Sequence, residues 1–287
     1  RGCDKFCTFC IVPFTRGRER SRSIDGIVGE TKKAISNGFS EITLLGQNVN
    51  SYNYNGEKFP DLLDAVAKID GLKRIRYTSP HPQDINEDLL RIMAKHDNIC
   101  NYIHLPLQAG SNRILKRMNR TYTKEDFIEL SKKIRTFLPG VGISTDIIVG
   151  FPGETEEEFN ETLEVMKKVK FDSAFTFKYS PRKGTKAIEY DDQLREDEKQ
   201  YRLTKVIELQ KFNTKLRNQS YVNKVVDVLI EKKSKKSEHK WAGRTESNKW
   251  VIFNRLDFNI NDIVPVLITK SKGITLYGEI LKKVKVA

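Results

Sequence analysis

The sequence predicts an α/β domain followed by a small all-β module. Short apolar strands alternate with amphipathic helical stretches from residue 24 to about residue 179, which is typical of a parallel sheet covered by helices on its outer face. From residue 221 onward the pattern changes to short β segments separated by turns, which is typical of a small barrel. The predicted domain boundaries are therefore 1–215 and 219–287.

The elements follow from where the apolar runs lie and from the turn residues between them. The predicted strands of the first domain cover residues 41–45, 74–78, 102–105, 143–149 and 174–179. Helices are predicted between them at 24–37, 60–69, 86–95, 112–118, 124–137 and 155–169. A charged helix over 196–217 then connects to β segments at 225–230, 250–253, 264–269 and 276–280.

Charge points to the class of partner. The 51 Lys and Arg residues exceed the 38 Asp and Glu residues by 13, and this excess favours a polyanion such as a nucleic acid. A basic protein with no such partner is the alternative. The apolar runs are far shorter than a membrane span, so we expect no membrane partner and a cytoplasmic location.

Three of the four cysteines stand together at the start of the chain, where Cys3, Cys7 and Cys10 form the pattern C-x-x-x-C-x-x-C. Such a cluster is more typical of metal binding or catalysis than of disulfides. A zinc site would need Cys100 or a distant histidine as its fourth ligand. A redox pair of Cys7 and Cys10 would leave Cys3 without a role. A [4Fe–4S] cluster with one open iron would use all three, with Cys100 left to the core.

The cysteine loop resembles that of radical S-adenosylmethionine (SAM) enzymes. The resemblance extends to the methylthiotransferase branch through IVPFTRGRERSRS, LLGQNVNSY, TSPHP, HLPLQAGSNRILKRMNR and STDIIVGFPGET, and VPFTRGRERSR and GQNVNSY are similar to its MiaB type, the tRNA 2-methylthio-isopentenyladenosine synthases. It implies a partial, open TIM-like β/α barrel followed by a TRAM domain. It also implies a [4Fe–4S] cluster that binds and reductively cleaves SAM, so that a methylthio group is added at C2 of N6-isopentenyladenosine beside the tRNA anticodon.

The resemblance also implies which residues bind the cofactor. Gly46, Gln47 and Asn48 follow a predicted strand and match the element that holds the SAM amino group. Phe9 would pack near the adenine, and Thr145 and Asp146 would contact the adenosine. Gln108 and Ser111 are candidate ligands of SAM or substrate. Each of these segments also has a plain structural interpretation as a turn or a packing position, and His81 and His104 are interpreted as packing residues.

Two basic segments are candidate RNA contacts. Arginine forks suit phosphate groups, and four of them follow the cysteine loop, although a solvated turn is the alternative. Lysines in a predicted loop of the C-terminal module, which resembles an RNA-binding TRAM domain, would add affinity without sequence selectivity. The residues are Arg16, Arg18, Arg20 and Arg22 in the first segment and Lys232, Lys233, Lys235 and Lys236 in the second.

One departure from the family pattern sets a limit. Members carry a further N-terminal domain whose three cysteines hold a second [4Fe–4S] cluster, and this sequence has no second triad. We therefore expect a fragment that lacks that domain and the first barrel strand, and that is inactive in full thiolation by itself. A flavodoxin or ferredoxin is the expected electron donor. The alternatives are a methylthiotransferase acting on threonylcarbamoyl-adenosine or a ribosomal protein, and a non-catalytic RNA-binding metalloprotein.

Overall fold

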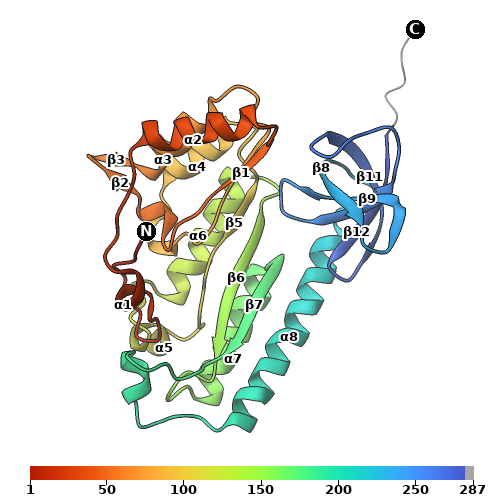
Figure 1. Ribbon diagram of the computed structural model, residues 1–287. Coiled ribbons are helices and arrows are strands. Elements are labelled where there is room, and N and C mark those ends of the chain that lie inside the picture. Colours follow the sequence, from red (N-terminus) through yellow and green to blue (C-terminus); the bar gives the residue numbers. More distant parts are fainter. Residues whose placement is uncertain (282–287) are drawn as a thin grey trace.

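The computed structural model describes residues 1–281 and contains a parallel half-barrel followed by a closed β-barrel (Figure 1). In the half-barrel, β1 pairs with β4, and β5, β6 and β7 form a second parallel sheet. A parallel bridge joins Ile75 of β4 to Ile99 in the segment just before β5. The strands are β1 (Glu41–Leu44), β4 (Arg74–Tyr77), β5 (Tyr102–His104), β6 (Gly142–Val149) and β7 (Ser173–Lys178). The predicted partial barrel and its five strands are confirmed.

Helices cover the outer face of this half-barrel, and their starts follow capping rules. Ser23 and Asn86 accept hydrogen bonds from backbone N–H groups at the starts of α2 and α4, and Thr123 and Thr155 form capping boxes. The helices are α1 (Val12–Arg16), α2 (Ile24–Ser36), α3 (Phe59–Ala67), α4 (Glu87–Lys95), α5 (Asn112–Arg117), α6 (Lys124–Phe137), α7 (Glu156–Val169) and α8 (Glu196–Gln219). The sequence analysis did not predict α1 or the small hairpin of β2 (Asn53–Tyr54) and β3 (Glu57–Lys58). None of the helices within residues 1–281 combines the length and apolar character needed to cross a bilayer.

The C-terminal module is a closed barrel with the strand order β10-β12-β11-β8-β9. Val228, Trp241, Phe253 and Val266 are among the side chains that fill its core. Its strands are β8 (Val225–Ser234), β9 (Ser237–Thr245), β10 (Trp250–Asn254), β11 (Ile263–Lys272) and β12 (Thr275–Ile280). The sequence analysis missed β9, whose polar residues Ser237–Lys240 conceal the strand. The last strand ends at Ile280. Residues 282–287 of the predicted second domain lie outside the residues that the structure describes.

The small barrel docks on the amino ends of the half-barrel strands. Arg74 and Arg76 on β4 are 2% and 6% exposed, and their guanidinium groups donate to backbone carbonyls of the small barrel. At the start of β6, a Cβ on Gly142 would lie 2.5 Å from the carbonyl oxygen of Ser247, so this close contact between the barrels requires glycine. Lys249 forms an ion pair with the buried Asp172 at 2.8 Å. The carboxyl ends of the strands therefore point away from the small barrel.

Candidate active site

The cysteine loop is held against the carboxyl side of the half-barrel by backbone hydrogen bonds. The Thr8 N–H donates to the Met118 carbonyl at 3.1 Å, and the Ala187 N–H donates to the Thr8 carbonyl at 2.9 Å. The Cys3 N–H donates to the carbonyl of Gly17 at 3.2 Å. The loop is thus fixed by the end of α5, by the segment after β7 and by the turn after α1.

All three cysteines of the loop are free and partly buried. Cys7 and Cys10 line one cavity of about 400 Å³. Burial raises the pKa of the Cys3 and Cys10 thiols, so metal binding must release their protons. Within residues 1–281 no three His, Cys, Asp or Glu side chains meet around a single metal ion. An iron–sulfur cluster does not require that, because each cysteine ligates a different iron, and a donor set of thiols alone fits such a cluster.

Arg120 extends the site in a way that the sequence did not reveal. Its guanidinium donates from Nη1 to Cys7 Sγ at 3.5 Å, from Nη2 to the Pro106 carbonyl at 3.3 Å and from Nε to the Tyr122 hydroxyl at 3.1 Å. None of the ion pairs within residues 1–281 gives Arg120 a carboxylate partner. The side chain therefore supplies positive charge next to the Cys7 sulfur. Arg120 is the last residue of the stretch HLPLQAGSNRILKRMNR, and its place in that stretch could have drawn attention to it.

The Gly46 turn follows β1 and divides its roles among three residues. A Cβ on Gly46 would lie 2.9 Å from Val49 Cα, so the turn requires glycine. Gln47 is exposed, whereas Asn48 is 8% exposed and donates to Asp84 Oδ2 at 2.8 Å. Gln47 is thus available to a ligand, and the Asn48 side chain fixes the turn.

Gln108 is the clearest candidate for an unfilled contact among the predicted cofactor residues. It lies just beyond β5 with a φ of 70°, a left-handed conformation that is uncommon for a residue other than glycine. Its side chain is 7% exposed, and Oε1 has no hydrogen-bond partner in the described part of the chain. A buried amide oxygen without a donor is costly, which suits a position that completes its bonding with a ligand.

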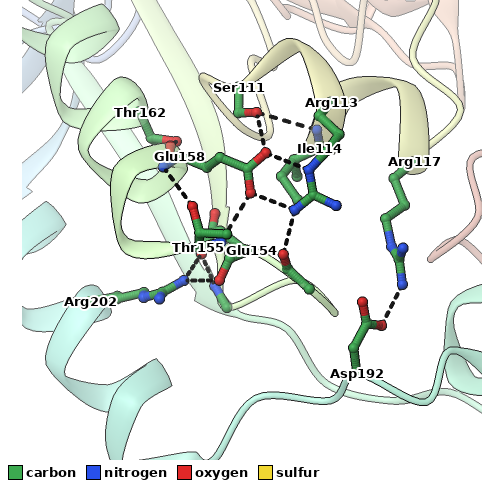
Figure 2. A network of polar contacts seen from close by, with 12 residues as sticks. Ser111, Arg113, Ile114, Arg117, Glu154, Thr155, Glu158, Thr162, Asp192 and Arg202 are labelled. Atoms are coloured by element: carbon green, nitrogen blue, oxygen red, sulfur yellow. Dashed lines mark hydrogen bonds and ion pairs between the residues drawn. The ribbon is translucent and has the colours of Figure 1, made fainter.

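Ser111 is placed differently from Gln108. It caps α5, accepts from the Ile114 N–H and donates to Glu158 Oε1 at 3.0 Å (Figure 2). With 2% exposure and both bonds made inside the protein, its side chain is not presented to a ligand. Burial opposes ionisation of Glu158, but Arg113, the Thr155 N–H and Ser111 outweigh it and lower the pKa of that carboxyl to about 2. Ser111 therefore caps α5 and links it to α7 in this structure.

A second buried acid shapes the turn after β6 (Figure 2). Glu154 accepts from the Gly150 N–H at 2.7 Å and pairs with Arg202 of α8 at 2.7 Å. Burial raises the pKa of the Glu154 carboxyl to about 7, although both donors favour its charged form. This pair ties α8 to the turn at the carboxyl end of β6.

Thr145 and Asp146 point to opposite faces of β6, as successive strand residues do. Thr145 is fully buried and accepts from the Leu107 N–H at 3.0 Å, so it braces the chain after β5. Asp146 is partly exposed and faces His104 at 3.2 Å. Phe9 packs edge-on against Phe151 with centroids 6.5 Å apart. Of the predicted adenosine contacts, Asp146 and Phe9 therefore remain accessible.

Comparison with known proteins shows the family. A model of the radical SAM superfamily matches residues 1–166, more than half of the chain. The chain belongs to the radical SAM superfamily. The cofactors of this family are a [4Fe–4S] cluster and SAM, and the three thiols and the unpaired Gln108 oxygen of this radical SAM half-barrel suit them. A TRAM domain model matches residues 219–281, the closed barrel.

Relatives and solved structures extend the comparison. The chain is 50% identical over 281 residues to a tRNA-2-methylthio-N(6)-dimethylallyladenosine synthase of Clostridium tetani, covering 97% of this chain and 62% of that protein. A protein of the same name from Alkaliphilus oremlandii is 47% identical over 285 residues, covering 98% and 60%. The chain thus spans about three fifths of these relatives' length. The radical SAM enzyme coproporphyrinogen III oxidase of Escherichia coli shares the fold, with a TM-score of 0.54 at 15% identity over 85% of this chain and 64% of that one.

The two basic segments lie on different sides of the molecule (Figure 1). All four arginines are exposed, and Arg20 and Arg22 line a groove of about 920 Å³ along β1 that also takes in Gly46 and Gln47. The structure thus brings one predicted RNA segment to a predicted cofactor turn. The lysines belong to the small barrel instead, and the prediction of a single lysine loop is wrong for two of them. Lys232 and Lys233 continue β8, and Lys235 and Lys236 alone form the turn to β9.

Proposed function

We propose that this chain is the catalytic and TRAM part of a tRNA methylthiotransferase that adds a methylthio group at C2 of N6-isopentenyladenosine, also called N6-dimethylallyladenosine. The observation that carries the proposal is the 50% identity over 97% of the chain to a relative of that name. The exposed arginines beside the Gly46 turn support an RNA substrate. We propose domain boundaries of 1–215 and 219–287, and the cytoplasm, where tRNA is modified, as the location.

Each part of the site has a task in this proposal. Cys3, Cys7 and Cys10 hold the cluster, and Arg120 offsets negative charge at the Cys7 sulfur. Gln47 and Gln108 orient SAM. When bound, the cluster and SAM would supply the radical chemistry that opens a C–H bond of the substrate. The half-barrel excludes water from that step, and the arginines and lysines position the RNA backbone.

Three finer parts of the proposal concern partners and residues outside this chain. A second [4Fe–4S] cluster in a preceding domain would serve the sulfur transfer, which agrees with the greater length of the relatives. A further strand beside β1 stays a prediction, and β1 pairs only with β4 in the described part of the chain. A flavodoxin or ferredoxin is proposed as the electron donor.

Nucleoside analysis tests the proposal directly. In tRNA from a strain that lacks the gene, 2-methylthio-N6-isopentenyladenosine should disappear and N6-isopentenyladenosine should accumulate. The intact gene should restore the methylthio group, whereas the same gene with Cys7→Ala should not. Persistence of the methylthio nucleoside in the deletion strain would contradict the assignment of substrate and reaction.

A further inference from the structure

The inner, concave face of the half-barrel carries a polar series of Tyr102, Ser144, His104 and Asp146, of which only Asp146 is a predicted cofactor contact. Side chains alternate along strands, so Ser144 and Asp146 on β6 face the same side as His104 on β5. His104 Nδ1 lies 2.8 Å from Ser144 Oγ, and its Nε2 lies 3.2 Å from Asp146 Oδ2. Tyr102 bonds Ser144 in turn.

The donors of this series can all point in one direction. In this direction Tyr102 donates to Ser144, Ser144 donates to His104 Nδ1, and His104 donates from Nε2 to Asp146. The series therefore ends at the Asp146 carboxylate, where only Oδ2 receives a contact from it. No residue among 1–281 donates to Asp146 Oδ1, and this side chain is 28% exposed. An oriented and partly open carboxylate is an acceptor for a ligand N–H group.

Two phenylalanines stand beside this carboxylate. Phe175 on β7 is the register partner of Asp146, and its ring meets the His104 ring edge-on with centroids 5.9 Å apart. Phe177 lies two residues further along the same face, toward the carboxyl end of the strands. Phe175 and Phe177 are 57% and 51% exposed, which is unusual for aromatic side chains inside a barrel. Such rings next to one polar group are typical of a pocket that binds a flat, partly apolar ligand.

This surface adjoins the predicted cofactor site. The Gln108 N–H donates to the Asp146 carbonyl at 2.8 Å, and the Ile148 N–H donates to the Gln108 carbonyl at 2.9 Å. A ligand on Phe177 and Asp146 would therefore lie next to the residue whose buried Oε1 has no partner. The face is placed where a substrate can meet the cofactor.

We propose that Phe175, Phe177 and the His104–Asp146 pair form the subsite that selects an adenine with an apolar N6 substituent. This inference rests on the proposed function and adds the residues that recognise the target base. Asp146 accepts a hydrogen bond from N6–H, the one exocyclic donor that a substituted adenine keeps. The two rings contact the dimethylallyl group and stack with the base, as aromatic side chains do with unpaired RNA bases.

The test compares two synthetic anticodon stem–loop RNAs that differ only in whether the target adenosine carries N6-dimethylallyl. Their dissociation constants are measured with the full chain at one salt concentration by fluorescence anisotropy. We expect the unaltered chain to prefer the modified RNA by about tenfold or more, the effect of an apolar group in a matching pocket. Phe175→Ala and Phe177→Ala should remove most of this preference. They should weaken the unmodified RNA by a smaller factor, because its adenine loses only the stacking contact.

Two further variants separate the parts of the subsite. Phe212→Ala on α8 is the matched control, because Phe212 is also 57% exposed but lies on the outer helix, and the preference should remain. Asp146→Asn should weaken both RNAs by a similar factor, because both adenines donate from N6. A preference that persists in both phenylalanine variants would overturn the inference and leave the proposed function intact.

A failure of the proposed function has a different signature. If the unaltered chain binds neither stem–loop, the RNA part of the proposed function fails before any variant is compared. If it binds both RNAs equally, RNA binding stands but the subsite is wrong. Equal thermal midpoints of the phenylalanine variants and the unaltered chain establish that a lost preference is not a loss of folding.

Discussion

Two sets of arginines with the same R-x-R spacing have opposite environments in this protein. Arg74 and Arg76 alternate along β4 and are almost completely buried under the small barrel, where they donate to backbone carbonyls. Arg20 and Arg22 follow the cysteine loop, are exposed, and line the groove beside β1. One set fixes the two barrels to each other at the amino ends of the strands. The other is free to meet a ligand near the carboxyl ends.

The two sets differ in how far their ion pairs are buried. Arg76 also pairs with Glu41 at 3.0 Å, so its charge is balanced inside the interface. Arg22 pairs with Glu30 at 2.7 Å, but both side chains are more than 60% exposed, and such a pair contributes little to folding. Buried arginines thus contribute to stability, whereas exposed ones remain available for binding.

The largest expected effect is the loss of the cluster. Cys7→Ala should abolish iron uptake during anaerobic reconstitution, because one of three cluster ligands and the partner of Arg120 are lost. Iron per chain and the visible absorption of the cluster measure this. Cys100→Ala is the matched control, since Cys100 is 2% exposed in the core and should leave iron uptake unchanged. Normal iron content in Cys7→Ala would remove the cysteine loop from the proposed site.

The next effect concerns the buried arginines. Arg76→Met should lower the free energy of unfolding by about 3–5 kcal/mol, because it leaves Glu41 with fewer partners and two carbonyls of the small barrel without donors. Denaturant titration measures the change. The same substitution at Arg22 should stay within about 0.5 kcal/mol, as is usual for exposed positions. Equal effects of the two substitutions would contradict the contrast between the arginine sets.

The sequence was sufficient for the half-barrel because its strands are apolar runs set between amphipathic helices. It also predicted a helix over 155–169, and α7 begins there with Thr155 in a capping box. It did not predict β9, since the strand begins with Ser237, Glu238, His239 and Lys240, whose side chains carry no apolar alternation. Pairing with β8 and β10 supplies what local pattern lacks.

The site was predictable only where a motif carries the chemistry. The spacing of the three cysteines predicts the cluster ligands, and the resemblance makes Gln108 a candidate ligand of SAM or substrate; both stay predictions. Arg120 was missed because its distance from Cys7 depends on how the end of α5 meets the loop, a contact between segments far apart in sequence. The burial of Ser111 and Thr145 was equally hidden, since which face a serine or threonine presents depends on the tertiary packing.

The ion pair of Arg113 with Glu158 is intermediate in exposure between the two arginine sets, and it predicts how stability depends on pH. Arg113 and the other donors hold the pKa of Glu158 at about 2, below the usual value of 4.5. Because the folded-state pKa is lowered, the stabilisation is complete above pH 4.5 and is lost as pH falls toward 2. Because the Arg113 side chain is 51% exposed and solvent screens the pair, it amounts to about 1–2 kcal/mol. Glu158→Gln should flatten the loss of stability between pH 5 and pH 2–3, measured by thermal unfolding. Glu129→Gln, on the exposed face of α6, should leave that slope as it is.

The smallest effect concerns the lysines of the small barrel and would extend the contrast to RNA binding. Lys235 and Lys236 lie at the turn between β8 and β9, whereas the Lys232 ammonium lies 4.5 Å from the centre of the Trp250 ring. A lysine that contacts phosphate should lower the slope of log affinity against log salt by about 0.7–0.9 when replaced by alanine, with a uniform loss across RNA sequences. We expect that change for Lys235→Ala and Lys236→Ala. The change should be smaller for Lys232→Ala, because the Lys232 ammonium already makes a cation–π contact with the Trp250 ring. Slopes that fall only when Arg20 or Arg22 is replaced would place the whole RNA contact at the groove beside β1.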